Sequence, residues 1–222
     1  ATILNHPNFG WAVQAKDMLP VKKLYLFELY NGHPSVRNFG DPRHPSTEQL
    51  WDDLLTQGMT IYGVGSDDAH HFAEWAPKKS NPGRGWVMVQ AKELTSKALT
   101  DAMTRGDFYS SSGVMLKKVV RHTDEISIEI DEIATDKELA SPILIGRVVK
   151  EGKPGYLVEF IGPRGKVIQS SLETKASCLV NLPYLRCKVT RRIKREDGSL
   201  LEYYAWTQPV FTDQRGEKKD YE

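Results

Sequence analysis

Two adjacent stretches decide the fold: "STEQLWDDLLTQG" at residues 46–58 and "IYGVGSDDAHHF" at residues 61–72. The first has capping residues at its start, apolar side chains at helical spacing and a terminal Gly58, and it predicts a helix. The second begins with the apolar run "IYGVGS", which predicts a buried strand. A helix followed directly by a buried strand is typical of an α/β layer with parallel strands.

The same alternation runs through the first 110 residues. Strands are predicted at residues 2–4, 24–30 and 86–91, and helices at 11–19 and 95–107. Short connections between such elements favour a parallel sheet or a barrel. The N-terminal half is therefore expected to be an α/β domain.

After about residue 113 the pattern changes to short strands. "EISIEIDE" alternates almost perfectly, "FIGPRGKVI" and "REDGS" contain turn signals, and no helix is expected. Several short strands separated by turns predict an antiparallel β-sandwich. We therefore expect two domains, an α/β domain over residues 1–113 and a β-sandwich-like domain over residues 114–222.

Composition limits the classes of partner. Hydrophobic residues make up 40% and charged residues 27%, and the formal net charge of +1 gives no reason to expect nucleic acid binding. No apolar run approaches the roughly 18–20 residues that cross a bilayer, so no membrane partner is expected. No signal peptide is visible, and both a cytoplasmic location and export after cleavage stay open. Cys178 and Cys187 are either paired or reduced.

Polar side chains stand at the ends of three predicted strands. His6 follows the first strand, Glu28 lies near the end of the second, and Asp68 and His70 follow the third. The carboxyl ends of parallel strands meet at one edge of a sheet, where active sites are built. A helix N-cap would explain one aspartate but not His70. We therefore expect a metal or catalytic site at this edge.

The residue types indicate the kind of metal. Imidazole and carboxylate together suit zinc, manganese or iron. Asp68 and His70 are two residues apart, so both face the same side of an extended segment. Because no thiolate joins the set, a structural cysteine-rich zinc site is not expected.

Five blocks in order carry a family resemblance: "LNHPNFGW", "FELYNG", "GVGSDDAHHF", "GRGWVMVQAKELTSKAL" and "GDFYSSSGV". Together they resemble the later part of the polymerase-and-histidinol-phosphatase (PHP) superfamily. The nearest branch contains small metal-dependent phosphoesterases and hydrolases of carbamate and other esters. The resemblance implies a distorted seven-stranded β/α barrel with two or three metal ions. An accessory β-domain would follow from about residue 114.

The resemblance also implies roles for single residues. His6, Asp68 and His70 would be metal ligands, with Asp68 and His70 at the catalytic centre. Glu28 would lie at the site as a ligand or a substrate contact. Arg84, in a glycine-rich loop, would bind the substrate's phosphate or carboxylate, or else be a solvated loop arginine.

Other polar candidates are weaker. His33 is expected to be an exposed loop residue rather than a ligand. His71 is expected to lie beside the site or in solvent. Ser110 is assigned to a turn, since no His/Asp pair accompanies it.

One departure from the family is large. The PHP barrel opens with a His-x-His motif, an Asp, and a further His and Glu, all upstream of the "NHP" block. No His-x-His occurs here, and five residues precede His6. We therefore expect an upstream polypeptide, possibly a separate chain, to complete the barrel and its metal centre.

The expected function is a metal-dependent hydrolase of small phosphate esters that uses metal-activated water. Carboxylic or carbamic esters are variant substrates. The alternative is a non-catalytic binding module with a degenerate or incomplete PHP barrel.

Overall fold

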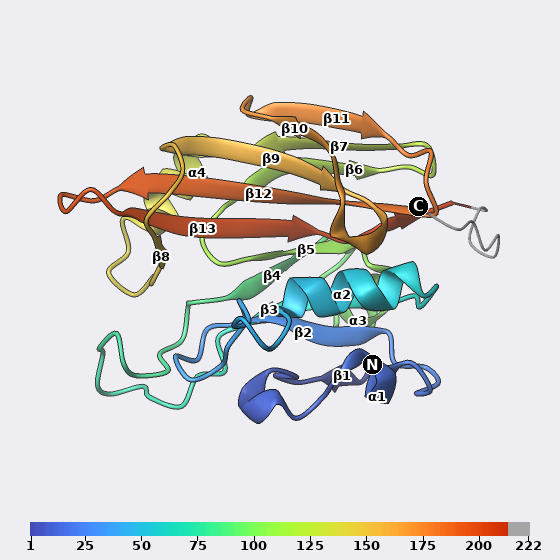
Figure 1. Cartoon of the computed structure of the whole chain (residues 1–222), viewed down its shortest axis with the longest axis horizontal. Coiled ribbons are helices and arrows are strands. Elements are labelled where there is room, and N and C mark those ends of the chain that lie inside the picture. Colours follow the sequence, from blue (N-terminus) through green and yellow to red (C-terminus); the bar gives the residue numbers. More distant parts are fainter. Residues whose placement is uncertain (213–222) are drawn as a thin grey trace.

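The computed structural model describes residues 1–212 as three β-sheets with few helices (Figure 1). Its helices are α1 (Ala15–Met18), α2 (Thr47–Thr56), α3 (Ser96–Arg105) and α4 (Glu132–Leu139), with 3₁₀ turns η1 (Phe9–Trp11) and η2 (Pro163–Gly165). Its strands are β1 (Ile3–Leu4), β2 (Leu26–Asn31), β3 (Tyr62–Ser66), β4 (Trp86–Val89), β5 (Phe108–Ser111), β6 (Leu116–Arg121), β7 (Glu125–Ile130), β8 (Arg147–Val149), β9 (Gly155–Ile161), β10 (Val167–Ser171), β11 (Lys175–Leu179), β12 (Tyr184–Lys194), β13 (Leu200–Thr207) and β14 (Val210–Phe211). The fold is mixed and β-rich. No helix in this part of the chain is long and apolar enough to cross a membrane.

The first sheet is parallel, with the order β1-β2-β3. All of β2 is buried, because the sheet is covered on both faces. Phe27 packs with Trp51 and Leu54 of α2 on one face. Leu26 packs with Phe108 of β5 on the other. Continuous apolar runs are typical of parallel strands that are buried on both sides.

Helix α2 confirms the helix predicted over residues 46–58. The Ser46 hydroxyl accepts a hydrogen bond from the backbone N–H of Gln49 (3.1 Å), and the Gln49 side chain accepts one from the Ser46 N–H (2.8 Å). This reciprocal pair is a capping box, and it fixes where the helix begins. The Trp51 indole donates to the Ile61 carbonyl (3.0 Å), which ties the helix to the start of β3.

The other two sheets form a sandwich-like arrangement. One has the order β10-β9-β12-β13-β5-β4, with β8 beside β13 and β14 beside β12; the other has the order β11-β7-β6. Ile126, Ile128 and Ile130, the alternate residues of β7, pack in one core with Val158 and Val189 of the larger sheet. Figure 1 shows these strands above the layer of α2 and the parallel sheet. The antiparallel sandwich expected for the C-terminal half is confirmed.

Two sequence expectations differ from the structure. The strand predicted over 86–91 is not part of a parallel layer, because β4 pairs antiparallel with β5. Gly106 ends α3 at φ +77° and turns the chain back along β4. Helix α4 was not expected; the Asp131 side chain caps it by accepting from the Ala134 N–H (2.9 Å).

The barrel itself is not seen within residues 1–212, which contribute three parallel strands and no closed barrel. The predicted division near residue 113 falls after β5, and β5 pairs with β13 in the large antiparallel sheet. The two expected domains therefore share one sheet.

Within residues 1–212, one edge of β3 is hydrogen-bonded by side chains and not by another strand. The Gln208 amide accepts from the Gly63 N–H (2.8 Å) and donates to the Gly63 carbonyl (2.9 Å). The Ser110 hydroxyl accepts from the Gly65 N–H (2.8 Å) and also donates to the Gly63 carbonyl (2.8 Å). Ser110 is thus a buried strand residue rather than the expected turn residue. These bonds join the parallel sheet to the sandwich.

Candidate functional site

The site lies where the three parallel strands end. His6 follows β1, Glu28 lies in β2, and Asp68 and His70 follow β3, as the sequence suggests. The long loop after β3 (residues 67–85, teal at the left of Figure 1) extends from this edge.

Glu28 is the centre of the cluster. Its carboxylate is buried and accepts hydrogen bonds from the His6 backbone N–H (2.6 Å), the Asn31 amide (2.8 Å) and the Ser66 hydroxyl (2.5 Å). Both carboxylate oxygens are used. Three donors from the ends of three segments therefore hold this side chain in place.

Asn31 is a site residue that sequence reasoning missed. The β2–β3 register shifts between Glu28 and Tyr30, which marks a bulge. In a regular strand Asn31 and Glu28 would face opposite sides, but the extra residue brings them to the same side. The Asn31 amide also donates to Asp68 Oδ2 (3.1 Å), and so links Glu28 to the loop after β3. No signal in the sequence marks the bulge.

The Asp68 backbone orients His70. Nδ1 of His70 lies 2.6 Å from the Asp68 carbonyl oxygen. Because a carbonyl oxygen only accepts, Nδ1 is the protonated nitrogen in this contact, and the neutral tautomer that fits it has its lone pair on Nε2. The His70 side chain is 61% exposed, so this nitrogen is accessible. The His33 ring stands edge-on to that of His70, with centroids 5.6 Å apart.

The His6 and His71 rings have other neighbours. The His6 ring lies edge-on to Phe9, with centroids 5.6 Å apart, and only the His6 backbone touches Glu28. Nδ1 of His71 lies 3.0 Å from the Ser80 hydroxyl. The geometry therefore assigns His71 to the loop and leaves the ligand role of His6 a prediction.

Arg84 organises the loop after β3. Its guanidinium is buried and donates to the carbonyls of Ile143 (3.3 Å), Ala76 (2.8 Å) and Lys79, and to the Asn81 side chain (2.9 Å). Burial lowers the pKa of this guanidinium from its usual value. These contacts account for four of its five N–H groups, and the substrate-binding role remains a prediction.

The cluster contains residue types that bind metal ions. The donor chemistry of Asp68 and His70 suits zinc, manganese or iron. Within residues 1–212, however, no three His, Cys, Asp or Glu side chains converge on one point. The described residues therefore do not form a complete ligand set at this edge.

The cysteines do not contribute a nucleophile. Cys178 and Cys187 are both buried and unbonded, so the disulfide left open by the sequence is absent. Burial raises the pKa of each thiol and keeps it protonated at neutral pH.

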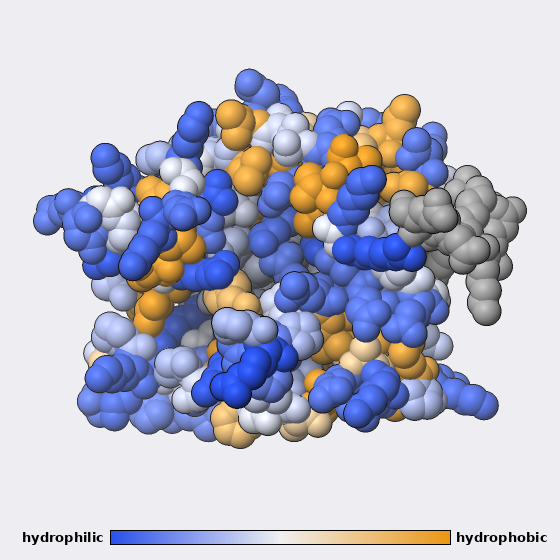
Figure 2. Space-filling view, in the orientation of Figure 1, coloured by the Kyte–Doolittle hydropathy of each residue, from blue (hydrophilic) through white to orange (hydrophobic). Residues whose placement is uncertain are grey.

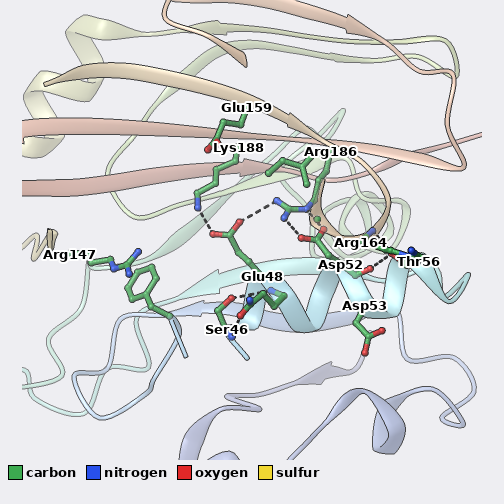
Figure 3. A pocket seen from close by; sticks show the side chains of 14 residues that line it. Ser46, Glu48, Asp52, Asp53, Thr56, Arg147, Glu159, Arg164, Arg186 and Lys188 are labelled. Atoms are coloured by element: carbon green, nitrogen blue, oxygen red, sulfur yellow. Dashed lines mark hydrogen bonds and ion pairs between the residues drawn. The ribbon is translucent and has the colours of Figure 1, made fainter. Parts of the chain in front are cut away.

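A second polar region lies between α2 and β12, around a cavity of about 710 Å³ (Figure 3). The Arg186 side chain is 1% exposed and donates to both oxygens of Asp52 (2.7 and 2.6 Å). Lys188 donates to Glu48 (2.6 Å). Each cation is paired with a carboxylate of opposite charge, and these pairs connect α2 to the sandwich.

No known protein family, curated protein or solved structure matches this chain.

Proposed function

We propose that the edge formed by Glu28, Asp68 and His70 is part of the active site of a metal-dependent hydrolase of small phosphate esters. The observation that carries the proposal is the His70–Asp68 contact. A metal-ligating histidine usually donates its other ring N–H to a carbonyl or carboxylate, which fixes the ring and its tautomer. His70 has that arrangement, with Nε2 exposed.

In this proposal His70 Nε2 and the Asp68 carboxylate would hold the ion, and His6 would join them through a change in its ring orientation. When bound, such an ion lowers the pKa of a coordinated water and polarises the phosphoryl oxygen. Asn31 positions the Asp68 carboxylate, and buried Glu28 holds Asn31 in turn. Carboxylic and carbamic esters are variant substrates, since they need the same activated water.

The remaining ligands are proposed to come from polypeptide beyond residues 1–212. Strand β1 has β2 on one side, and within the described residues no strand pairs with its other edge. Such an edge is a template for a further strand. An upstream segment or a separate chain that pairs there would extend β1–β3 towards a distorted PHP-type barrel, open at the edge of β3 that Gln208 and Ser110 occupy, and bring its own ligands to the same site.

A second candidate is a binding module without catalysis. The incomplete ligand set within residues 1–212 favours it. In that case the sandwich, rather than the edge of the parallel sheet, would carry the interaction.

Neighbouring residues of the same type provide matched controls. We expect His70→Ala and Asp68→Asn to lower the turnover of an aryl phosphate by the natural protein about 100-fold, the upper end of the range seen when a group that supports a metal ligand is removed. His71→Ala and Asp67→Asn change loop contacts at Ser80 and Gly83 instead, and should retain most of the turnover. Equal effects in both pairs would reject the assignment, as would full activity in His70→Ala.

A further inference from the structure

A small cavity connects the candidate active site to the sandwich. Its volume is about 250 Å³. Asn31 and His33 are among its lining residues, and they contact Asp68 and His70 respectively. Phe39 and Arg147 of β8 line it as well. Figure 2 shows this face of the molecule hollowed between the sandwich and the layer of α2 and the parallel sheet.

The lining of the cavity is mostly uncharged. Buried Tyr30 is a neutral phenol there, because burial raises its pKa to about 12. Pro34, Val36 and Ile145 add apolar surface. Such a lining suits the body of a small organic molecule, and it leaves recognition to the few charged groups that face the cavity.

Arg147 is a cation that lines both this cavity and the larger one beside α2. Its guanidinium stands 4.2 Å from the centre of the Phe39 ring, and its side chain is 42% exposed. The nearest carboxylate is Glu202, whose Oε2 lies 3.8 Å from Arg147. Figure 3 shows Arg147 set apart from the ion pairs between α2 and β12.

Glu202 does not cancel this charge. It is buried and already bonded to Arg192 Nε (2.7 Å) and to the Tyr204 hydroxyl (2.5 Å). Its negative charge is therefore balanced by Arg192, and the contact with Arg147 is too long for a hydrogen bond. Arg192 and Arg147 together outweigh the single charge of Glu202. The second cation that lines the cavity, Arg84, has four of its five N–H groups occupied, so Arg147 is the cation free to bind an anion.

We propose that this cavity receives the non-reacting part of the substrate and that Arg147 binds an anionic group on it. The inference rests on the proposed function, and it names the substrate class: small phosphate esters whose leaving group carries a carboxylate or a second phosphate. A guanidinium stacked on a ring keeps its N–H groups in one plane, which suits two parallel bonds to either anion. The phosphoryl group to be cleaved would then lie at the Asp68 and His70 end.

The test compares aryl phosphates that differ only in the group at the para position of the ring. The probes are 4-carboxyphenyl phosphate, benzene-1,4-diol bisphosphate and the uncharged analogue 4-carbamoylphenyl phosphate. In the natural protein we expect kcat/KM for one or both charged substrates to exceed that for the amide about 10–100-fold, as a charge-assisted bond allows. Whichever charged substrate is preferred distinguishes a carboxylate from a phosphate as the ligand.

Variants of Arg147 test whether this residue causes the preference for charged substrates. Arg147→Gln should raise KM for the charged substrates and reduce the preference to within about threefold, while turnover of the amide is retained. Arg147→Lys should retain part of the preference, and Lys150→Gln, which removes a nearby exposed charge, should leave it intact. A preference that persists in Arg147→Gln, or no preference in the natural protein, would overturn the inference while leaving the hydrolase assignment intact.

A binding measurement separates the two claims. Calorimetry with 4-carboxyphenylphosphonate, which cannot be hydrolysed at its P–C bond, needs no turnover. Binding that weakens in Arg147→Gln but not in Lys150→Gln supports the cavity assignment even if no ester is hydrolysed. Equal binding by both variants, or none by the natural protein, contradicts it.

Discussion

Glu48 is a partly buried carboxylate whose ionisation is coupled to the fold. Burial opposes its ionisation, but Lys188 and Arg186 more than offset this, and the pKa falls from 4.5 to about 2. Lys188 Nζ lies 2.6 Å and Arg186 Nη1 3.4 Å from its oxygens. The carboxylate therefore stabilises the fold only while it is ionised.

The first residue-scale prediction is an acid-dependent loss of stability. The contribution of Glu48 is fully present above about pH 4.5 and is lost as pH falls towards 2, and the shift corresponds to on the order of 3 kcal/mol. Glu48→Gln should be less stable at pH 7 and lose less stability between pH 5 and pH 2.5. Urea unfolding across this range measures both. Parallel pH curves for the two proteins would contradict the coupling.

Two residues of the candidate site have unusual backbone conformations. His6 has a φ of +30° and Asp68 a φ of +48°. Residues other than glycine rarely adopt positive φ, and such positions cluster at functional sites. The strain falls on two of the residues that the sequence places at the edge of the parallel sheet, and so agrees with a functional role there.

At the scale of elements, the free edge of β3 is closed by side chains. Gln208 and Ser110 provide the hydrogen bonds that a fourth strand would otherwise make. Both residues are fully buried. Gly65 allows the close approach of Ser110, since a Cβ at Gly65 would stand 3.3 Å from the Ser110 Cβ.

We predict that Gln208→Met lowers the free energy of unfolding by about 1–3 kcal/mol, because it leaves the buried Gly63 N–H without an acceptor. Methionine keeps the volume and removes the hydrogen bonds. Gln90→Met, at an exposed position, is the matched control and should change stability by less than about 0.5 kcal/mol. If both variants unfold at the same urea concentration as the parent, the edge bonds do not stabilise the junction.

At the scale of the whole molecule, local patterns predicted the elements better than their assembly. The alternation in "EISIEIDE" and the capped helix at 46–58 were enough to place β7 and α2. The direction of β4 depends on Gly106, and the shared sheet depends on pairing between β5 and β13 across nearly a hundred residues. Neither the turn at Gly106 nor the pairing of β5 with β13 produces a periodic pattern in the sequence.

The site was predictable to a similar degree. Strand ends placed Glu28, Asp68 and His70 near one another, because parallel strands end at a common edge. The role of Asn31 depends on a bulge, and that of Arg84 depends on four loop contacts that form only in the fold. Residue type and spacing therefore located the site, whereas tertiary hydrogen bonds decided what each side chain contacts.

The most direct test of the hydrolase proposal is the metal content of the purified natural protein, measured by elemental analysis beside two double variants. We predict at least one manganese, zinc or iron atom per chain in the natural protein and in the control Asp67→Asn/His71→Ala. In Asp68→Asn/His70→Ala the content should fall well below one. No stoichiometric transition metal in the natural protein, or the same content in all three proteins, would contradict the proposed metal site.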